Sequence, residues 1–398
     1  MSSRCVWLLA GWLVLVSGGI AEAQSKTGTP PATREAPRAE GEKAEPAIDF
    51  DRAYKLFQRR KGGEKLTAEE EAYIQRAKAA RQKQNTPNGA GQSDARNRPA
   101  PTPRETIGLK PLSEMSATDL YKGQDGGLYG GGQNVPPTEH ARAAEKELAR
   151  IEPLDAQGKP SPDGKIAFIS ISMSNATQEF SKFKQIADAD PTKSTKLTIV
   201  DCAQGGQAMA EWVSPQAPPW TVADQRISNA KVSPQQVQVA WVKLANKGPV
   251  GDLEMHGRKL QRDTQAVIQN AKARFPNLRI IYLSSRIYGG YAGSNLNPEP
   301  YAYESAFAAR WLIQDQIAGA AALNANPEKG EVKAPLLLWG PYLWADGTTP
   351  RTADKLAYTR TDLGPDGTHP SEAGREKVAR LMLHFYHTDP LAKSLFVR

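Results

Sequence analysis

The stretch from Ile166 to Ile171 reads IAFISI, and Ser172-Met173-Ser174-Asn175 follows it directly. Four similar apolar runs occur later in the chain: LTIV at 197–200, VQVAWV at 237–242, LRIIYLS at 278–284 and LLLW at 336–339. Short apolar runs bounded by polar residues predict buried strands. The segments between them are long enough for helices, which we expect at about 176–187, 255–274, 302–322 and 371–386.

Strands that alternate with helices are typical of a parallel sheet whose strands are joined by helical crossovers. Because the runs are apolar on both faces, each strand is expected to lie between two layers of helices. The sequence therefore predicts an α/β fold, a three-layer sandwich around a five-stranded parallel sheet, in residues 161–398.

The start of the chain has the composition of an export signal and a tether. Residues 1–23 combine a charged start, an apolar run and the small-residue site Ala21-Glu22-Ala23. This pattern predicts a signal peptide that is cleaved near Ala23, and hence export to the periplasm or the extracellular space. Residues 24–47 are rich in Pro, Ala, Glu and Lys, which predicts a disordered linker.

A small helical module is expected over residues 48–84, where apolar residues recur at helical spacing and Thr67-Ala68-Glu69-Glu70 forms a helix start. Residues 85–106 form a second linker. Residues 107–160 then lead into the α/β domain.

Charge and cysteine content exclude several classes of function. The 398 residues have a formal net charge of +8, and many of the basic residues lie in the N-terminal third. No aromatic and basic motif of a nucleic-acid-binding protein accompanies them, so association with an anionic envelope or polysaccharide is the alternative. Of the two cysteines, Cys5 leaves with the signal peptide, which excludes an internal disulfide in the mature chain.

Polar residues stand at the carboxyl ends of the predicted strands, where open α/β sheets form their ligand sites. Ser174 follows the first strand, Gly206 follows the second and Asn246 the third, while Asp366-Gly367-Thr368-His369 precedes the last helix. A serine hydroxyl becomes a nucleophile when an imidazole takes its proton, and a carboxylate orients that imidazole. Asp366 and His369 are three residues apart on a turn, so both are able to serve Ser174.

The same four blocks occur in the same order in SGNH (GDSL-like) hydrolases, and the chain resembles this superfamily over about residues 160–390. The block DCAQGGQAMAEW at 201–212 is similar to that of sialate O-acetylesterase and plant carbohydrate esterase relatives. The resemblance implies a flavodoxin-like fold and a serine esterase that needs no metal and no cofactor. It implies an acyl-enzyme on Ser174 with His369 as general base and Asp366 orienting it. Gly206 and Asn246 would join the Ser174 backbone in an oxyanion hole.

Two blocks depart from the family pattern. Gly-Asp-Ser is replaced by Ser172-Met173-Ser174, which leaves Ser170 and Ser172 as alternative nucleophiles, and Gly-x-Asn-Asp is replaced by Leu244-Ala245-Asn246-Lys247. Two interpretations therefore stand: an exported carbohydrate O-deacetylase, or a catalytically inactive module of the same fold that binds a glycan.

The segment RIYGGYAGSNLNPEPYAYE at 286–304 follows the fourth strand and is expected to line the mouth of the site. Tyr288 and Tyr291 offer flat faces for sugar rings, Arg286 adds a polar contact, and Trp212 forms the opposite wall. The predicted substrate is therefore a small-molecule or carbohydrate ester. The glycine-rich run at 126–132 lacks the following lysine of a phosphate-binding loop.

Overall fold

The computed structural model of the protein describes residues 53, 56, 59, 64, 66–84 and 99–397. The chain divides into two compact units, residues 1–86 and 87–398. In the first unit, helix α2 (Ala68–Gln84) begins at the predicted capping box: the Thr67 N–H donates to the Glu70 carboxylate at 2.9 Å, and Thr67 Oγ1 accepts from the Glu70 N–H at 3.2 Å. The predicted signal peptide at 1–23, the linker at 24–47 and residues 85–98 lie outside the described residues.

A single sheet of five parallel strands, in the order β2-β1-β3-β4-β5, organises the second unit. The strands are β1 (Ile166–Ile171), β2 (Leu197–Val200), β3 (Val237–Lys243), β4 (Ile280–Ser284) and β5 (Leu336–Trp339). All strand residues are buried except Thr198, so both faces of the sheet are covered. The predicted α/β fold with a five-stranded parallel sheet is confirmed.

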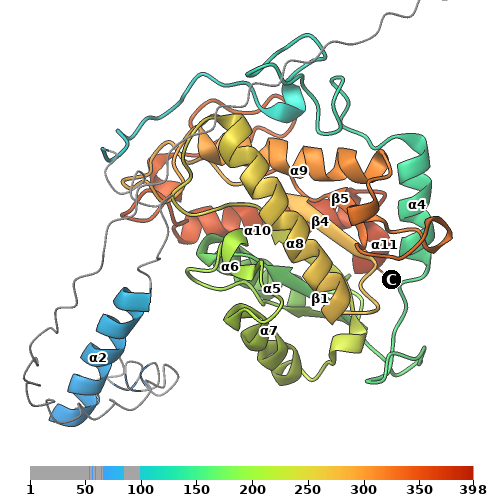
Figure 1. Cartoon of the computed structure of the whole chain (residues 1–398), viewed down its shortest axis with the longest axis horizontal. Coiled ribbons are helices and arrows are strands. Elements are labelled where there is room, and N and C mark those ends of the chain that lie inside the picture. The colour runs from blue at the N-terminus through green and yellow to red at the C-terminus, as the bar shows by residue number, and fades with distance from the viewer. Residues whose placement is uncertain are drawn as a thin grey trace, which may run out of the picture. The chain divides into compact units, whose positions relative to one another are not determined.

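Helices connect the strands and cover the sheet (Figure 1). α5 (Ser174–Asp188) packs against α10 (Glu372–Thr388), and α8 (Arg258–Arg274) packs against α9 (Tyr301–Ile317). The shorter helices are α4 (Thr138–Ala149), α6 (Met209–Trp212), α7 (Pro218–Asn229) and α11 (Lys393–Phe396). Among the described residues, no helix combines the length and the apolar character that crossing a membrane requires.

Aromatic packing fixes α5, and hence Ser174 at its start, on the sheet. Phe168 of β1 meets Phe180 of α5 edge to face, with ring centroids 5.3 Å apart, and meets Tyr386 of α10 at 5.1 Å. Such pairs contribute roughly 0.5–1.5 kcal/mol each beyond their buried area. The first turn of α5 is therefore held firmly at the carboxyl end of β1.

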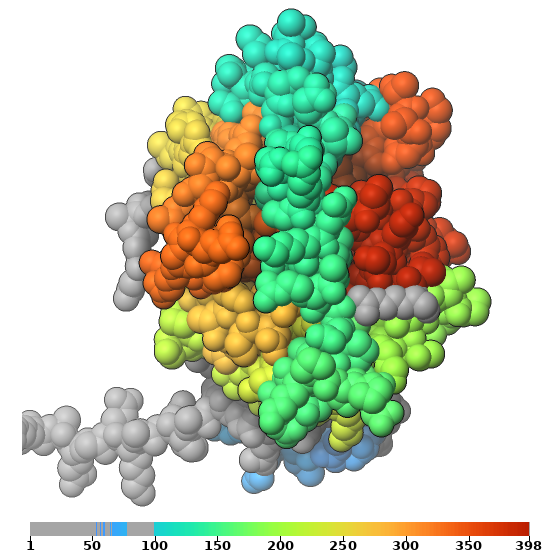
Figure 2. Space-filling model, turned by 90° about the vertical axis from the view of Figure 1, so that its right-hand side faces the viewer, coloured from blue at the N-terminus to red at the C-terminus, as the bar shows by residue number. Residues whose placement is uncertain are grey.

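The segment before β1 belongs to the same core. Leu112 and Met115 are buried in it, and α4 contacts β4 and β5. Both the Ile107 and the Gly108 N–H groups donate to the Asp346 carboxylate at 2.8 Å. Figure 2 shows this segment running as a strap across one side of the unit.

Candidate active site

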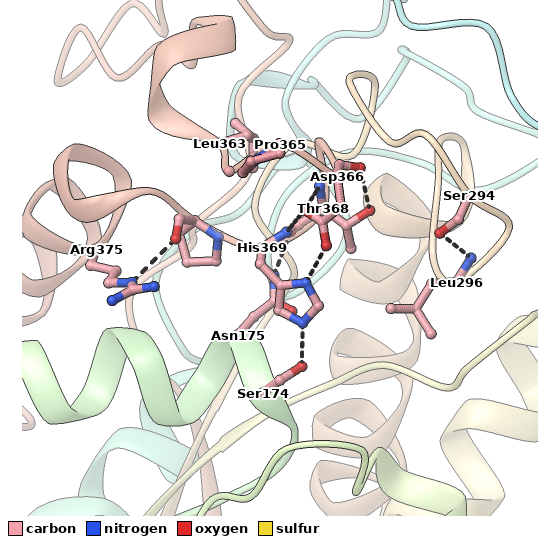
Figure 3. A network of polar contacts seen from close by, with 12 residues as sticks. Ser174, Asn175, Ser294, Leu296, Leu363, Pro365, Asp366, Thr368, His369 and Arg375 are labelled. Carbon is pink, nitrogen blue, oxygen red and sulfur yellow. Dashed lines mark hydrogen bonds and ion pairs between the residues drawn. The ribbon is translucent and has the colours of Figure 1, made fainter. Parts of the chain in front are cut away.

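Ser174, His369 and Asp366 form a hydrogen-bonded chain at the carboxyl end of the sheet (Figure 3). Ser174 is the first residue of α5, and its Oγ lies 2.7 Å from His369 Nε2. His369 Nδ1 lies 2.5 Å from Asp366 Oδ2. A serine hydroxyl bonded to an imidazole that is itself bonded to a carboxylate is the arrangement that activates serine as a nucleophile.

The turn that carries His369 is tightly shaped. Asp366 Oδ1 accepts the backbone N–H groups of Thr368 and His369, both at 3.0 Å. Gly367 has φ +64°, and a Cβ there would lie 1.7 Å from the Tyr291 carbonyl oxygen, so only glycine fits. Burial raises the pKa of Asp366, but the hydrogen bonds from His369 and Thr368 outweigh it and lower the pKa below its ordinary value. The carboxylate therefore stays charged beside the imidazole.

The alternative nucleophiles are engaged elsewhere. Ser170 Oγ donates to Asp201 Oδ1 at 2.6 Å, and Ser172 Oγ donates to the Lys243 carbonyl. Both serines are fully buried. Of the three candidates, Ser174 is the serine that the structure places against the histidine.

A pocket of about 230 Å³ opens in front of Ser174. It is lined by Met173, Ser174, Asn175, Gly206, Ala208, Ala245, Asn246, Lys247, Arg286, Leu296, Asn297, Thr368 and His369. Five of the predicted site residues thus share one pocket, and Asp366 supports His369 from the other ring nitrogen. Within the part of the chain that the structure describes, no three His, Cys, Asp or Glu side chains gather closely enough to hold a metal ion.

Gly206 and Asn246 face this pocket from the loops after β2 and β3. Gly206 has φ +77°, which favours glycine, and apart from its chain neighbours no atom lies within 4 Å of the place a Cβ would take. Asn246 is fixed by two hydrogen bonds: its Oδ1 accepts from the Ala210 N–H at 2.9 Å, and its Nδ2 donates to Asp263 Oδ2 at 2.6 Å. An amide nitrogen carries two hydrogens, so a second N–H remains for a ligand.

Two further residues position the site, and the sequence analysis missed both. Asp263 on α8 holds Asn246, and Asn175 donates from Nδ2 to the Thr368 carbonyl at 2.7 Å, which ties α5 to the histidine turn. The signals in the sequence are that Asn175 follows Ser174 and that Asp263 is the one acidic residue of α8. The N–H of Ser174 lies in the first turn of α5, where helix N–H groups have no partner in the helix and negative charge is favoured.

The aromatic residues predicted to bind substrate do not reach the pocket. Tyr288 and Trp212 are fully buried, and Tyr291 is 5% exposed. Tyr288 Oη donates to the Arg104 carbonyl at 2.9 Å, and its ring packs edge to face on Tyr291; Trp212 packs in the same way on Trp220. The prediction that these three line the mouth is wrong, because each ring is packed inside the unit against other aromatic rings.

The loop after β4 instead contacts the turn of residues 366–369, which carries His369. The Gly293 N–H donates to the Asp366 carbonyl at 2.9 Å. From this loop, Arg286, Leu296 and Asn297 reach the pocket.

No known family model matches the chain, and no curated protein matches it in sequence. Among solved structures, a protein from Arabidopsis thaliana is 16% identical, over 51% of this chain and 64% of that chain, with a TM-score of 0.29. The periplasmic domain of a lipopolysaccharide acetyltransferase from Salmonella ser. Paratyphi A is 15% identical, over 62% of this chain and 96% of that domain, with a TM-score of 0.30. A gut microbial diltiazem-metabolizing enzyme is 16% identical, over 58% of this chain and 48% of that chain, with a TM-score of 0.32.

The chain thus spans less than two thirds of the Arabidopsis protein and about half of the diltiazem-metabolizing enzyme. At these identities and TM-scores, the similarities carry no argument about function. The functional conclusion rests on the geometry of the site.

Proposed function

We propose that this protein is a serine ester hydrolase of the SGNH type that cleaves a short acyl ester through an acyl-enzyme on Ser174. The observation that carries the proposal is the 2.7 Å contact between Ser174 Oγ and His369 Nε2, with Asp366 Oδ2 2.5 Å from the other ring nitrogen. The strand order and the packing of α5 on α10 and of α8 on α9 support the finer proposal of a three-layer, flavodoxin-like sandwich.

The proposed reaction has two halves. His369 Nε2 takes the proton of Ser174 Oγ as this oxygen attacks the ester carbonyl carbon. The proton then passes to the leaving alkoxide, the ester C–O bond breaks, and the acyl group remains on Ser174. A water molecule, deprotonated by His369, then attacks the acyl carbon. The bond between this carbon and Ser174 Oγ breaks, His369 returns the proton to Oγ, and the acid leaves. Asp366 keeps the imidazole in the required tautomer and stabilises its charged form.

The oxyanion of each tetrahedral intermediate needs donors in fixed positions. The N–H groups of Ser174 and Gly206 and the free N–H of Asn246 Nδ2 supply them in this proposal. Removal of one such donor typically costs about 3–4 kcal/mol of transition-state stabilisation. The fixed orientation of the Asn246 amide supports its assignment as a donor.

The size of the pocket favours a short acyl group. Pockets for drug-sized ligands measure roughly 300–1,000 Å³, and this one measures about 230 Å³. Acetyl on a carbohydrate is the finer proposal; with the tyrosines buried, its support is the resemblance described from the sequence. Export after cleavage near Ala23 is proposed from the sequence of residues 1–23.

The test uses 4-nitrophenyl acetate and a fluorophosphonate probe on the full chain. The wild type should hydrolyse the ester and be labelled on Ser174, whereas Ser174→Ala and His369→Ala should each lose about 10³-fold or more in turnover. Ser172→Ala is the matched control and should keep most of the activity. A folded wild type that neither reacts with the probe nor hydrolyses any ester would overturn the proposal. The alternative interpretation, a catalytically inactive module that binds a glycan, would then remain.

A further inference from the structure

Arg286 stands apart from the other deeply buried arginines. It follows β4, lines the pocket of Ser174 and is 2% exposed. Its Nε is buried without a partner, as is that of Arg310, but the Arg286 side chain also makes no other hydrogen bond and no ion pair with any described residue. By contrast, Arg310, also 2% exposed, donates to the Asp125 carbonyl at 2.6 Å and pairs with the Asp125 carboxylate at 3.1 Å.

The carboxylates near Arg286 are held by other groups. Glu179 forms a fully buried ion pair with Lys243 through one carboxylate oxygen, and its other oxygen has no hydrogen-bond partner among the described residues. Glu299 accepts from the Trp344 indole at 2.8 Å and from a backbone N–H at 2.7 Å. These two carboxylates and that of Asp366, which is bonded to His369, stabilise the charge of Arg286 only at longer range, and burial lowers its pKa. A buried cation without a bonded partner is costly, so the structure points to a partner that comes from outside.

A second unpaired group lies in the same pocket. Asn297 Nδ2 donates to the Asn246 carbonyl at 3.1 Å, which fixes the orientation of the amide. Its Oδ1 is buried and accepts no hydrogen bond from the described residues. The pocket is therefore lined by Arg286, whose guanidinium lacks a bonded anion, and by Asn297, whose amide oxygen lacks a donor.

We propose that Arg286 binds a carboxylate of the substrate and that Asn297 accepts a hydroxyl of the same molecule. The inference rests on the proposed function and narrows its substrate to esters that carry an anionic group. A guanidinium suits this role because it binds a carboxylate through two parallel hydrogen bonds. A hydroxylated acid, such as an acylated sugar acid, satisfies both groups at once.

The sheet sets the distance between the two ends of such a substrate. Ser174 follows β1 and Arg286 follows β4, and β3 lies between these strands. Neighbouring strands are about 4.8 Å apart, so the two backbone positions are separated by about 10 Å across the sheet. An ester carbonyl at Ser174 and a carboxylate a few bonds away at Arg286 fit this spacing.

The kinetic test compares charged esters with neutral ones of the same shape. The first pair is O-acetyl galacturonate against O-acetyl galactose, with the carboxylate on the alcohol part. The second pair is mono-4-nitrophenyl glutarate against 4-nitrophenyl butyrate, with the carboxylate on the acyl part. The wild type should prefer the charged member of at least one pair by about 10- to 100-fold in kcat/KM, since a hydrogen bond to a charged group is worth that much. The pair that shows the preference identifies the part of the ester that carries the anion.

Arg286→Gln should reduce this preference to near one, mainly through KM for the charged ester, and Arg286→Lys should restore part of it. Lys182→Gln is the control: it removes a positive charge from the same unit outside the pocket, where Lys182 pairs with Glu372 at 2.8 Å, and should leave the preference as it is. Equal wild-type kcat/KM within both pairs would overturn the inference and leave the proposed function intact. The inference would also be overturned if Arg286→Gln lost kcat/KM equally on charged and neutral esters and had a lowered melting temperature.

A binding measurement separates the inference from the proposed function. Calorimetry of Ser174→Ala with galacturonate and with glutarate should show binding of at least one acid, and the Ser174→Ala, Arg286→Gln double variant should lose it. If the acid binds in this way but the wild type hydrolyses no ester, the proposed esterase function is refuted and the proposed anion site stands. Equal binding by both variants would refute the anion site.

Discussion

Replacement of Asn246 by alanine tests the oxyanion hole directly. The side chain lines the pocket, has two structural bonds, from the Ala210 N–H and to Asp263, and keeps one further N–H. Loss of an oxyanion donor lowers kcat by about 10²- to 10³-fold. Because the donor acts on the transition state, KM for 4-nitrophenyl acetate should change little.

The same substitution also has a predictable effect on stability. It leaves the Ala210 N–H, which Asn246 Oδ1 now satisfies at 2.9 Å, without its acceptor. A lost hydrogen bond costs roughly 0.5–1.5 kcal/mol, so the melting temperature should fall by a few degrees. The rate must therefore be measured where circular dichroism shows the variant fully folded.

Asn270→Ala provides the matched control. Asn270 Nδ2 donates to the Val213 carbonyl at 2.7 Å, and the residue is not among those that line the pocket. It should lower the melting temperature and leave kcat unchanged. If a folded Asn246→Ala kept kcat within threefold of the wild type, Asn246 would be a structural residue and the oxyanion hole as proposed would be wrong.

Three further perturbations follow from the turn of residues 366–369 and from the start of the unit. Gly367→Ala should abolish activity, because the new Cβ would lie 1.7 Å from the Tyr291 carbonyl oxygen. It should destabilise the protein by more than the roughly 1–2 kcal/mol that a side chain costs in the left-handed conformation alone. Gly319→Ala, at φ +85° with open space around it, is the control in thermal melts. Asp366→Asn should lower kcat by about 10²- to 10⁴-fold. The pKa of Asp366 is lowered in the folded state, so its contribution to stability is present above the ordinary value of 3.8 and is lost as the pH falls through the lowered pKa. The melting temperatures of Asp366→Asn and of the wild type should therefore differ at pH 7 and converge in acid. A difference that stays constant with pH would contradict this prediction. A truncated protein that starts at Pro99 should keep full activity, whereas one that starts at Thr118 should fail to fold because it lacks the buried Leu112 and Met115. Soluble expression and circular dichroism show whether each truncated protein folds.

The strands were predictable because of how they are buried. A strand covered on both faces needs apolar residues at nearly every position, so each one stands out in the sequence as a short continuous run. β1, β2 and β5 occupy the predicted residues, and β3 extends one residue further to Lys243. Lys243 escaped prediction because a buried lysine depends on its partner Glu179, 64 positions away.

The residues of the candidate site were predictable for a different reason. Each follows a strand, and parallel strands bring their carboxyl ends to one edge of the sheet. These residues are Ser174, Gly206, Asn246 and Arg286. Position along the chain thus determines position in the site. This rule places a residue at the correct edge, but it does not say whether the side chain points into the pocket or into the core.

The residues 286–304 show where that rule fails. Tyr288 and Tyr291 leave the same edge as Arg286, yet both rings are buried, packed on each other. A tyrosine is able to bury its ring because its hydroxyl donates to a carbonyl. For Tyr288 that carbonyl belongs to Arg104, which precedes β1 by 62 residues of chain. Composition alone makes a sugar-binding surface and an aromatic support look the same.

Arg286 and Arg310 are indistinguishable by composition, since each is an arginine among apolar and aromatic neighbours. The difference between them is the bonding of the guanidinium, which only the three-dimensional structure reveals. Arg310 is surrounded by carbonyl and carboxylate oxygens from residues 124–127, so its charge is satisfied within the chain. Arg286 has no such bonds and lines the pocket of Ser174. In our proposal a substrate carboxylate supplies the hydrogen bonds that the chain itself does not, and this accounts for an arginine at this position.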